Sequence, residues 1–182
     1  MSFVHHAKKV WNLMINEELT IEVESRCISI WKDPWARRLA RATLLIDFNG
    51  QIVVVMDTSN GFWFLPGGGV EQGETVEETA KREAAEELGV KIEVNKVIGT
   101  YEVTLTSANH GEWVAIPPYI VVHAKPMGGQ LRPEYAPNRK IILINKKDCK
   151  SLLQSSDIPS EYECFKPHHY ISKEVVRQFV VL

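Results

Sequence analysis

The 182-residue sequence predicts an α/β (α+β) fold in which helices cover both faces of a mixed β-sheet. Two strand-like runs, 42–47 and 51–57, are separated by an Asn-Gly pair, which is a strong signal for a β-hairpin. A segment rich in Glu and Ala, 75–88, follows the hairpin and is predicted to be helical. Further strand-like runs come after it, at 91–97, 99–106, 119–125 and 140–144. Strands on both sides of a helix favour a mixed sheet over a purely antiparallel one.

The residues upstream of the hairpin are predicted to add a helix and strands to this core. Five apolar residues recur at helical spacing near the N-terminus: Val4, Ala7, Trp11, Met14 and Ile15. Two pairs, Ile21 with Val23 and Ile28 with Ile30, alternate as strand residues do. We therefore divide the chain into an extension, 1–36, packed on a core domain, 37–182. The extension is either a structural addition or an element for dimerisation or substrate selection.

The predicted helix carries signals at both of its ends. Thr75 and Glu78 are spaced as a capping box, and Gly89 is a typical C-terminal stop. At the other end of the chain's core, Asn145 is placed to cap a helix that runs through Leu153.

Three carboxylates gather on one face of the predicted helix, because residues three and four apart are neighbours there: Glu83, Glu86 and Glu87. Two of them border the apolar stripe, where unpaired charge is costly. A hard divalent cation such as Mg²⁺ would relieve this cost, since it takes carboxylate oxygens and is often shared with substrate phosphates. The alternative is a solvated helix face with ion pairs to Lys81 and Arg82. The preceding Pro-Gly-Gly-Gly loop, 66–69, favours the metal site because its backbone can approach a ligand closely.

The segment from Gly68 to Val90 resembles the Nudix box. It reads as a Gly, five residues, Glu, seven residues, Arg-Glu, an aliphatic, any residue, Glu-Glu, any residue, Gly and an aliphatic. The resemblance implies an α/β/α sandwich with a mixed sheet and a loop-helix-loop catalytic motif, and it makes 37–182 a Nudix hydrolase domain.

The same resemblance implies a role for each residue of the motif. The metal, Mg²⁺ or else Mn²⁺, is expected on Glu86 and Glu87, with Glu83 and the Gly67 carbonyl completing the site. Glu83 is also a candidate for the catalytic base. Arg82 belongs to the catalytic motif, where it is expected to pair with Glu74 and hold the loop on the helix.

A base outside the motif is a second possibility, and Glu102, Glu112 and Glu134 are the candidates. Glu134 is favoured because its segment resembles the Glu-bearing loop of mutator-type nucleotide pyrophosphohydrolases, the subgroup closest in loop pattern. Flanking Pro and Gly residues predict that this loop is mobile.

Four residues are candidates for substrate binding: Arg41, Phe62, Trp63 and Gly68. Arg41 could contact phosphate, but basic residues just before a strand lie as often on a solvated edge of the sheet. Phe62 or Trp63 could stack on a base, and the alternative for these aromatic residues is a place in the core. The pairs His5-His6 and His168-His169 are expected to be surface histidines.

Composition narrows the function classes. The chain has 21 basic and 23 acidic residues and a net charge of −2, which excludes bulk binding of nucleic acid. It has neither an apolar run of membrane-spanning length nor a secretory pattern, so we expect a cytoplasmic protein with no membrane association. Three cysteines without metal-site spacing are expected to be reduced thiols: Cys27, Cys149 and Cys164.

The leading functional hypothesis is divalent-metal-dependent hydrolysis of a pyrophosphate linkage. The substrate would be a nucleoside diphosphate derivative or a nucleoside triphosphate, and the products a nucleoside monophosphate plus the phosphorylated remainder or pyrophosphate. The alternative is a noncatalytic Nudix-fold sensor that binds a nucleotide metabolite. The expected partner is a small-molecule nucleotide, and the N-terminal extension could form a homodimer.

Overall fold

The computed structural model describes residues 15–33, 38–107, 111–132, 134–154 and 158–181. Within these ranges the strands form a nine-stranded mixed sheet with the order β1-β6-β7-β2-β3-β9-β8. In that order they are β1 (Ile15–Glu22), β6 (Val90–Thr106), β7 (Trp113–Gly129), β2 (Arg41–Phe48), β3 (Gln51–Asp57), β9 (Arg139–Asn145) and β8 (Glu134–Ala136). Two short strands, β4 (Trp63–Phe64) and β5 (Gly67–Gly69), pair with β3 and β2. The pairs β1–β6 and β2–β7 are parallel and the others are antiparallel.

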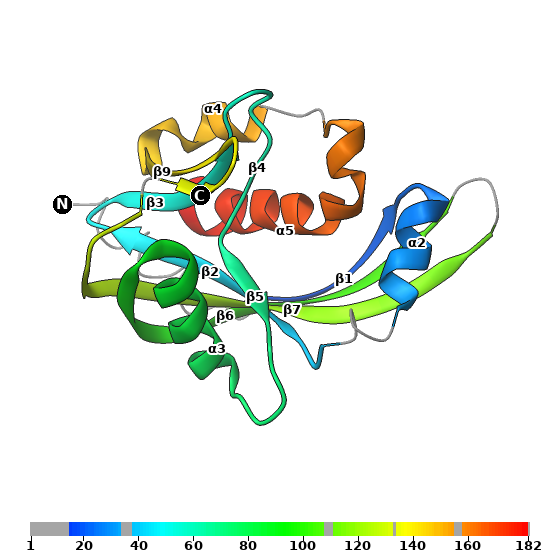
Figure 1. Cartoon of the computed structure of the whole chain (residues 1–182), viewed down its shortest axis with the longest axis horizontal. Coiled ribbons are helices and arrows are strands. Elements are labelled where there is room, and N and C mark those ends of the chain that lie inside the picture. The colour runs from blue at the N-terminus through cyan, green and yellow to red at the C-terminus, as the bar shows by residue number, and fades with distance from the viewer. Residues whose placement is uncertain (1–14, 34–37, 108–110, 133, 155–157, 182) are drawn as a thin grey trace.

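Helices lie on both faces of this sheet (Figure 1). One face carries α3 (Val76–Glu83), which continues into a π-helical turn, η2 (Ala84–Leu88). The other face carries α2 (Ser25–Lys32), α4 (Cys149–Gln154) and α5 (Lys166–Val176). Shorter turns, η3 (Lys146–Asp148), η4 (Ser160–Phe165) and η5 (Arg177–Val181), adjoin α4 and α5. The α/β/α sandwich expected from the sequence is confirmed.

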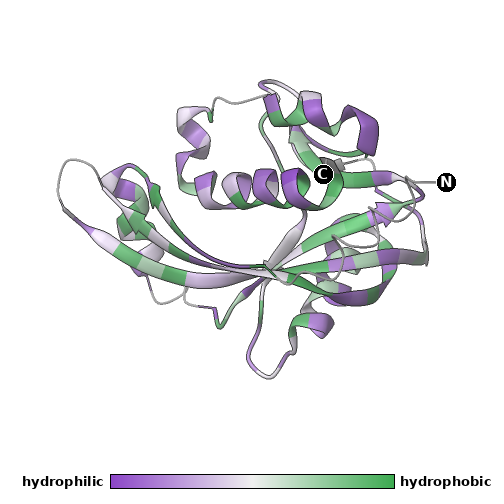
Figure 2. Ribbon diagram, turned by 180° about the vertical axis from the view of Figure 1, so that it is seen from behind, coloured by the Kyte–Doolittle hydropathy of each residue, from purple (hydrophilic) through white to green (hydrophobic). Residues whose placement is uncertain are grey.

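Each face of the sheet has its own hydrophobic core. Leu44 and Ile46 of β2 pack with Ala80 and Leu88 under α3, whereas Leu45 joins the cluster under α5. Successive side chains of a strand point to opposite faces, so the apolar run in β2 supplies both cores at once. Figure 2 shows the hydrophobic colouring of these central strands against the more hydrophilic helices.

The local signals in the sequence formed the expected elements. The hairpin between β2 and β3 turns at Asn49 and Gly50, both with positive φ angles, of 52° and 91°. Thr75 makes both hydrogen bonds of the capping box with Glu78, and Gly89 ends the helix in the left-handed region with φ of 75°. The predicted helix at 75–88 is therefore confirmed, with its last turn wound as a π-helix.

The N-terminal prediction is partly wrong. Ile15 begins strand β1, and the other four residues of the proposed helix lie outside the described residues. Ile28 and Ile30 lie in helix α2 instead of a strand. Cys27 and Ile28 of that helix are fully buried against the sheet, and this tertiary burial outweighs the preference of isoleucine for strands. β1 joins the main sheet through its parallel pairing with β6.

The expectation of three reduced thiols is wrong for two of them. Cys27 of α2 and Cys164 of η4 form a disulfide whose Cα atoms lie 5.0 Å apart. They are 137 residues apart in sequence, so spacing alone carries no sign of their proximity. Cys149 is a buried free thiol, and burial raises its pKa to about 11. Among the described helices, none is long and apolar enough to cross a membrane.

Candidate active site

Strand β5 lies directly against the carboxylate-bearing helix α3. It pairs antiparallel with β2, with Gly67 opposite Thr43 and Gly69 opposite Arg41. A Cβ atom on Gly67 would clash with the backbone of β2, and one on Gly68 would clash with the carboxylate of Glu83. Gly67, with a φ of 145°, is therefore required by its close approach to the backbone of β2, whereas Gly68 abuts a side chain.

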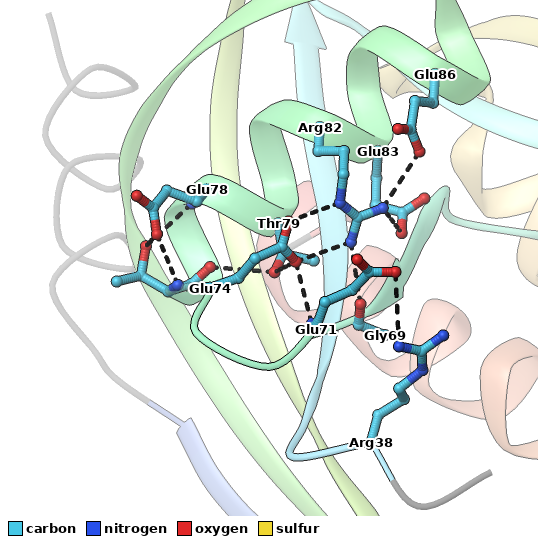
Figure 3. A network of polar contacts seen from close by, with 10 residues as sticks. Arg38, Gly69, Glu71, Glu74, Glu78, Thr79, Arg82, Glu83 and Glu86 are labelled. Carbon is cyan, nitrogen blue, oxygen red and sulfur yellow. Dashed lines mark hydrogen bonds and ion pairs between the residues drawn. The ribbon is translucent and has the colours of Figure 1, made fainter. Parts of the chain in front are cut away.

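Arg82 is the centre of an ion-pair network that holds the loop before α3 (Figure 3). Its guanidinium donates to both carboxylate oxygens of Glu74, at 2.7 and 2.9 Å. It also donates to Glu83 at 2.8 Å, to Glu86 at 3.2 Å and to the Gly69 carbonyl at 3.2 Å. The hydrogen bonds from Arg82 lower the pKa of Glu74 to about 2, so this carboxylate is ionised at any physiological pH. This is the Glu74–Arg82 pair expected from the sequence.

Glu87 lies on the side of the helix that faces the sheet. One carboxylate oxygen accepts a hydrogen bond from the Gly67 amide at 3.3 Å, and the other accepts one from the Tyr135 hydroxyl. Burial, followed by the negative charge of Glu83, raises the pKa of Glu87 to about 7, against the lowering effect of those two hydrogen bonds and of Arg41. The anionic form of Glu87 is thus penalised by its surroundings.

The three clustered carboxylates differ in exposure. The side chain of Glu83 is 11% exposed and that of Glu86 is 62% exposed, while Glu87 is partly buried. Both Glu86 and Glu87 belong to the π-helical turn η2, a feature that often occurs at functional sites.

The donor atoms of this cluster suit a hard divalent cation. They are carboxylate oxygens, and a cation would offset the repulsion that Glu87 feels from Glu83. The arrangement is not a ready-made cage: in the part of the chain that the structure describes, no three His, Cys, Asp or Glu side chains are grouped as metal ligands. Arg82 instead bridges Glu83 and Glu86.

The candidate bases outside the helix lie in different places. Glu134 is in strand β8 and pairs with Lys140 of β9, so this residue lies in a short strand instead of a loop, and its mobility stays a prediction. The strand forms because a turn at Asn138, with φ of 63°, folds this segment back as a hairpin. The carbonyl of Glu112 accepts from the Ser107 amide beside the β6–β7 hairpin, and Glu102 is exposed on β6.

Two candidate substrate residues are buried in the core. Trp63 is fully buried, and its indole donates to the Leu152 carbonyl at 3.2 Å. Phe62 stacks on Tyr162 with ring centroids 4.3 Å apart. Neither ring is available to a nucleobase, so the core alternative holds for both. The other two candidates, Arg41 and Gly68, lie at the β2–β5 pair beside the carboxylates.

The histidine pair 168–169 is not on the surface, contrary to expectation. His169 is 4% exposed and its ring contacts the Trp63 carbonyl at 2.6 Å. His168 is partly buried, and its ring lies 3.2 Å from the Tyr119 hydroxyl. Successive helix residues point in directions about 100° apart, so both can be covered when a helix lies in a crowded corner. The pair at 5–6 lies outside the described residues.

A cavity of about 400 Å³ opens beside β5, between α2 and the start of α5. Its lining includes Arg38, Arg41 and Gly69 together with Trp31, Phe165 and His168. No motif in the sequence marks Trp31, Phe165 or His168 as neighbours of Arg41 and Gly69, because these residues come from three distant segments. Tyr135 was missed for the same reason.

Comparison with known proteins identifies the family. The family model for the NUDIX domain matches residues 36–142, more than half of the chain. The chain belongs to the Nudix family. The carboxylates on α3 and η2 and the glycines of β5 are therefore those of a Nudix box.

Individual relatives include MutT-type Nudix proteins. A MutT-like protein from Streptomyces ambofaciens is 34% identical over 88 residues, which cover 48% of this chain and 51% of that protein. A putative 8-oxo-dGTP diphosphatase from Bacillus subtilis (strain 168) is 37% identical over 59 residues, covering 32% of this chain and 40% of that protein. The chain thus spans about half or less of the length of these curated relatives.

Among solved structures, the fold is similar to that of a NUDIX hydrolase from Nitrosomonas europaea. The TM-score is 0.51 at 17% sequence identity, and the match covers 78% of this chain and 71% of that one. This likeness shows the common fold.

Proposed function

We propose that the protein is a divalent-metal-dependent pyrophosphohydrolase. It would cleave the pyrophosphate linkage of a nucleoside diphosphate derivative or a nucleoside triphosphate and release a nucleoside monophosphate. The observation that carries the proposal is the placement of the side-chain-free strand β5 against Glu83 and Glu87 within a Nudix box. Because it has no side chains, this strand brings its backbone directly against the carboxylates.

Each residue of the site has a proposed role. Glu86, Glu87 and Glu83 would hold Mg²⁺, with Mn²⁺ as the substitute and the Gly67 carbonyl as a further ligand. The ion would neutralise phosphate charge and make a bound water more acidic. Arg82 holds the loop through Glu74, and its remaining contacts keep Glu83 and Glu86 oriented toward the same region.

Two residues are proposed as the base that takes the proton of the attacking water. Glu83 lies beside Gly68 in the site itself. Glu134 stays the candidate outside the box; it lies in β8 and directly precedes Tyr135, whose hydroxyl contacts Glu87. A comparison of kcat for Glu83→Gln and Glu134→Gln at saturating metal would assign the role, since loss of the base lowers kcat with little effect on KM.

The test is a nucleotide panel assayed with and without Mg²⁺ or Mn²⁺. We expect metal-dependent release of nucleoside monophosphate, and mass spectrometry in ¹⁸O-water would place the label on one phosphate product. Glu86→Gln and Glu87→Gln should each lower turnover by orders of magnitude. Glu77→Gln is the matched control, since Glu77 is an exposed residue of α3 that pairs with Lys81 at 2.6 Å. Release of free nucleoside would contradict the proposal.

A second candidate function is a noncatalytic sensor of a nucleotide metabolite. The observation that favours it is that the carboxylates already have protein partners: Arg82 holds Glu83 and Glu86, and Tyr135 holds Glu87. Nucleotide binding by calorimetry without turnover under any metal would select the sensor. Turnover that Glu87→Gln abolishes would select the enzyme.

Assembly and location complete the proposal. We propose a homodimer through the N-terminal extension, which light scattering of the full chain and of a chain lacking residues 1–14 would test.

A cytoplasmic location is proposed from the sequence, but the disulfide weighs against a reducing compartment. Thiol alkylation and mass spectrometry of protein taken directly from its source cells would decide this point.

A further inference from the structure

The cavity beside β5 has two aromatic walls that come from opposite ends of the chain. Trp31 of α2 donates from its indole to the Cys164 carbonyl at 3.3 Å, and its ring centroid lies 6.0 Å from that of His168. Phe165 lies 5.6 Å from His168 between ring centroids and remains 40% exposed. A large apolar ring left exposed at the mouth of a cavity has contact area available for a ligand.

The two walls are joined covalently next to the cavity. The Cys27–Cys164 disulfide connects α2 to η4, one residue before Phe165. The indole hydrogen bond of Trp31 reaches the same residue, Cys164. These links hold the spacing of the rings in the free protein, and a ligand therefore loses less free energy to ordering the site.

Positive charge lies between this cavity and the carboxylates. Arg41 lines the cavity, and it also lines a smaller one that includes Gly67 and His168. Its charge acts on the Glu87 carboxylate. Arg38 lies across Gly69 and forms an exposed ion pair with Glu71 at 3.5 Å. The part of a bound ligand that extends from the cavity toward Glu87 therefore passes Arg41.

His168 belongs to the aromatic wall as a neutral ring. Burial, followed by the positive charge of Arg41, lowers the pKa of His168 well below its ordinary value. Its ring contacts the Tyr119 ring edge to face, with centroids 5.3 Å apart. At neutral pH the His168 ring carries no positive charge, and among the described residues that line the cavity the cationic ones are Arg38 and Arg41.

We propose that this cavity is the nucleobase subsite, in which Trp31 and Phe165 contact a planar heterocycle while Arg41 meets the phosphate chain. The proposal rests on the proposed function for its substrate class and adds the residues that select the base. The volume of the cavity, about 400 Å³, lies within the range of small-molecule sites, roughly 300–1,000 Å³. Aromatic walls favour a flat π-system over an aliphatic group, and an adjacent arginine favours one that carries phosphate.

The N-terminal segment acquires a function from this assignment. Trp31 and Ile30 of α2 contribute directly to the cavity, so residues before the domain core help to select the substrate. The specificity element is formed only when α2 packs against η4 and α5, which also explains why no motif marks it in the sequence.

The experiment measures binding of AMP, GMP, CMP and UMP by calorimetry, with ribose 5-phosphate as the probe that lacks a base. Trp31→Ala and Phe165→Ala should each weaken the best-bound nucleotide about 5- to 150-fold, the loss expected for one stacking contact. Binding of ribose 5-phosphate should change less than twofold. Trp31→Phe should restore most of the affinity because it keeps an aromatic face.

Trp113→Ala is the matched control, because Trp113 is 64% exposed on β7 and does not line the cavity. This variant should bind every probe as the wild type does. Circular dichroism of each variant shows that the chain is folded, and a folded Trp31→Ala or Phe165→Ala protein that binds nucleotide with wild-type affinity overturns the proposal. Equal losses for ribose 5-phosphate and nucleotide also overturn it, since they would indicate a general distortion of the site.

The outcomes separate this proposal from the proposed function. Base-dependent binding that Trp31→Ala weakens, without hydrolysis of any nucleotide, supports the subsite and refutes the enzyme. Metal-dependent hydrolysis whose KM is unchanged in both Trp31→Ala and Phe165→Ala supports the enzyme and refutes the subsite.

Discussion

Single residues at the site are constrained by contact more than by conformation. Gly68 has an ordinary φ angle, yet a Cβ there would meet the Glu83 carboxylate. Tyr135 is far from the Nudix box in sequence, yet its hydroxyl donates to Glu87. The site therefore depends both on the absence of a side chain at Gly68 and on the hydroxyl of Tyr135.

Gly68→Ala should destabilise the protein by about 1–3 kcal/mol, because the added methyl group forces Glu83 and Arg82 to move. Urea unfolding followed by circular dichroism measures the loss. Gly128→Ala is the matched control, since Gly128 lies in β7 with open space at its Cβ position, and it should change stability by less than about 0.5 kcal/mol. A Gly68→Ala protein as stable as the control would contradict this packing argument.

Tyr135→Phe should lower turnover by about 10- to 100-fold, the usual cost of removing a partner that orients a metal ligand. The ring is kept, so the fold should be kept, and only the hydrogen bond to Glu87 is lost. Steady-state kinetics over a range of Mg²⁺ concentrations measures the effect. Tyr170→Phe on the exposed side of α5 serves as control, and equal kinetics in the two variants would show that the hydroxyl has no role.

At the scale of elements, helix α5 is hydrogen-bonded to the segment that leads into strand β5. Ser172 of α5 donates from its hydroxyl to the His168 carbonyl and accepts from the Leu65 amide at 2.8 Å. The buried ring of His169 contacts the Trp63 carbonyl. These contacts connect α5 to the segment that leads into the glycines, so the stability of α5 affects the position of β5.

Acidification should therefore destabilise the protein through α5. Burial lowers the pKa of both His168 and His169, so in the pH range below about 6.5 the unfolded chain binds protons that the folded chain does not. The stability that these two histidines contribute is full above about pH 6.5 and falls as pH decreases, by up to about 1.4 kcal/mol per pH unit for each histidine. The raised pKa of Glu87 acts in the opposite direction between about pH 4.5 and 7, so the histidine contribution is measured as the difference in slope between the wild type and a histidine variant, by urea unfolding at pH 5, 6, 7 and 8. His169→Gln should reduce the slope, and an unchanged slope would remove His169 from the explanation.

At the scale of the whole molecule, segments from distant parts of the chain meet beside the cavity. The N-terminal strand β1 pairs with β6, and helix α2 is bonded through Cys27 to Cys164 near the C-terminus. A cross-link between residues 137 positions apart restricts a large loop of the unfolded chain.

Reduction of the disulfide should destabilise the protein by about 2–4 kcal/mol, mainly because the unfolded chain regains freedom. Thermal unfolding with and without dithiothreitol measures the change in Tm. The variant with both Cys27→Ala and Cys164→Ala is the control, because it should unfold at one temperature regardless of reductant. A wild-type Tm that does not respond to complete reduction would contradict this prediction.

Local chemistry determined what the sequence could predict. The Asn49-Gly50 turn, the Thr75 capping box and the Gly89 stop each depend on neighbours within a few residues, so their signals are complete in the sequence. The carboxylate face of the Nudix helix follows in the same way from helical spacing. These signals were sufficient for the fold class, the family and the residues of the box.

Tertiary structure alone decided which residues surround that box. Tyr135 reaches Glu87 across 48 positions, and Cys27 reaches Cys164 across 137. Ile28 lies in a helix, Trp63 lies in the core and Trp31 lines the cavity, because burial of apolar area depends on the whole chain. The sequence determined the chemistry at the carboxylates by itself, whereas the proposed selection of a base depends on contacts that exist only once both ends of the chain have packed together.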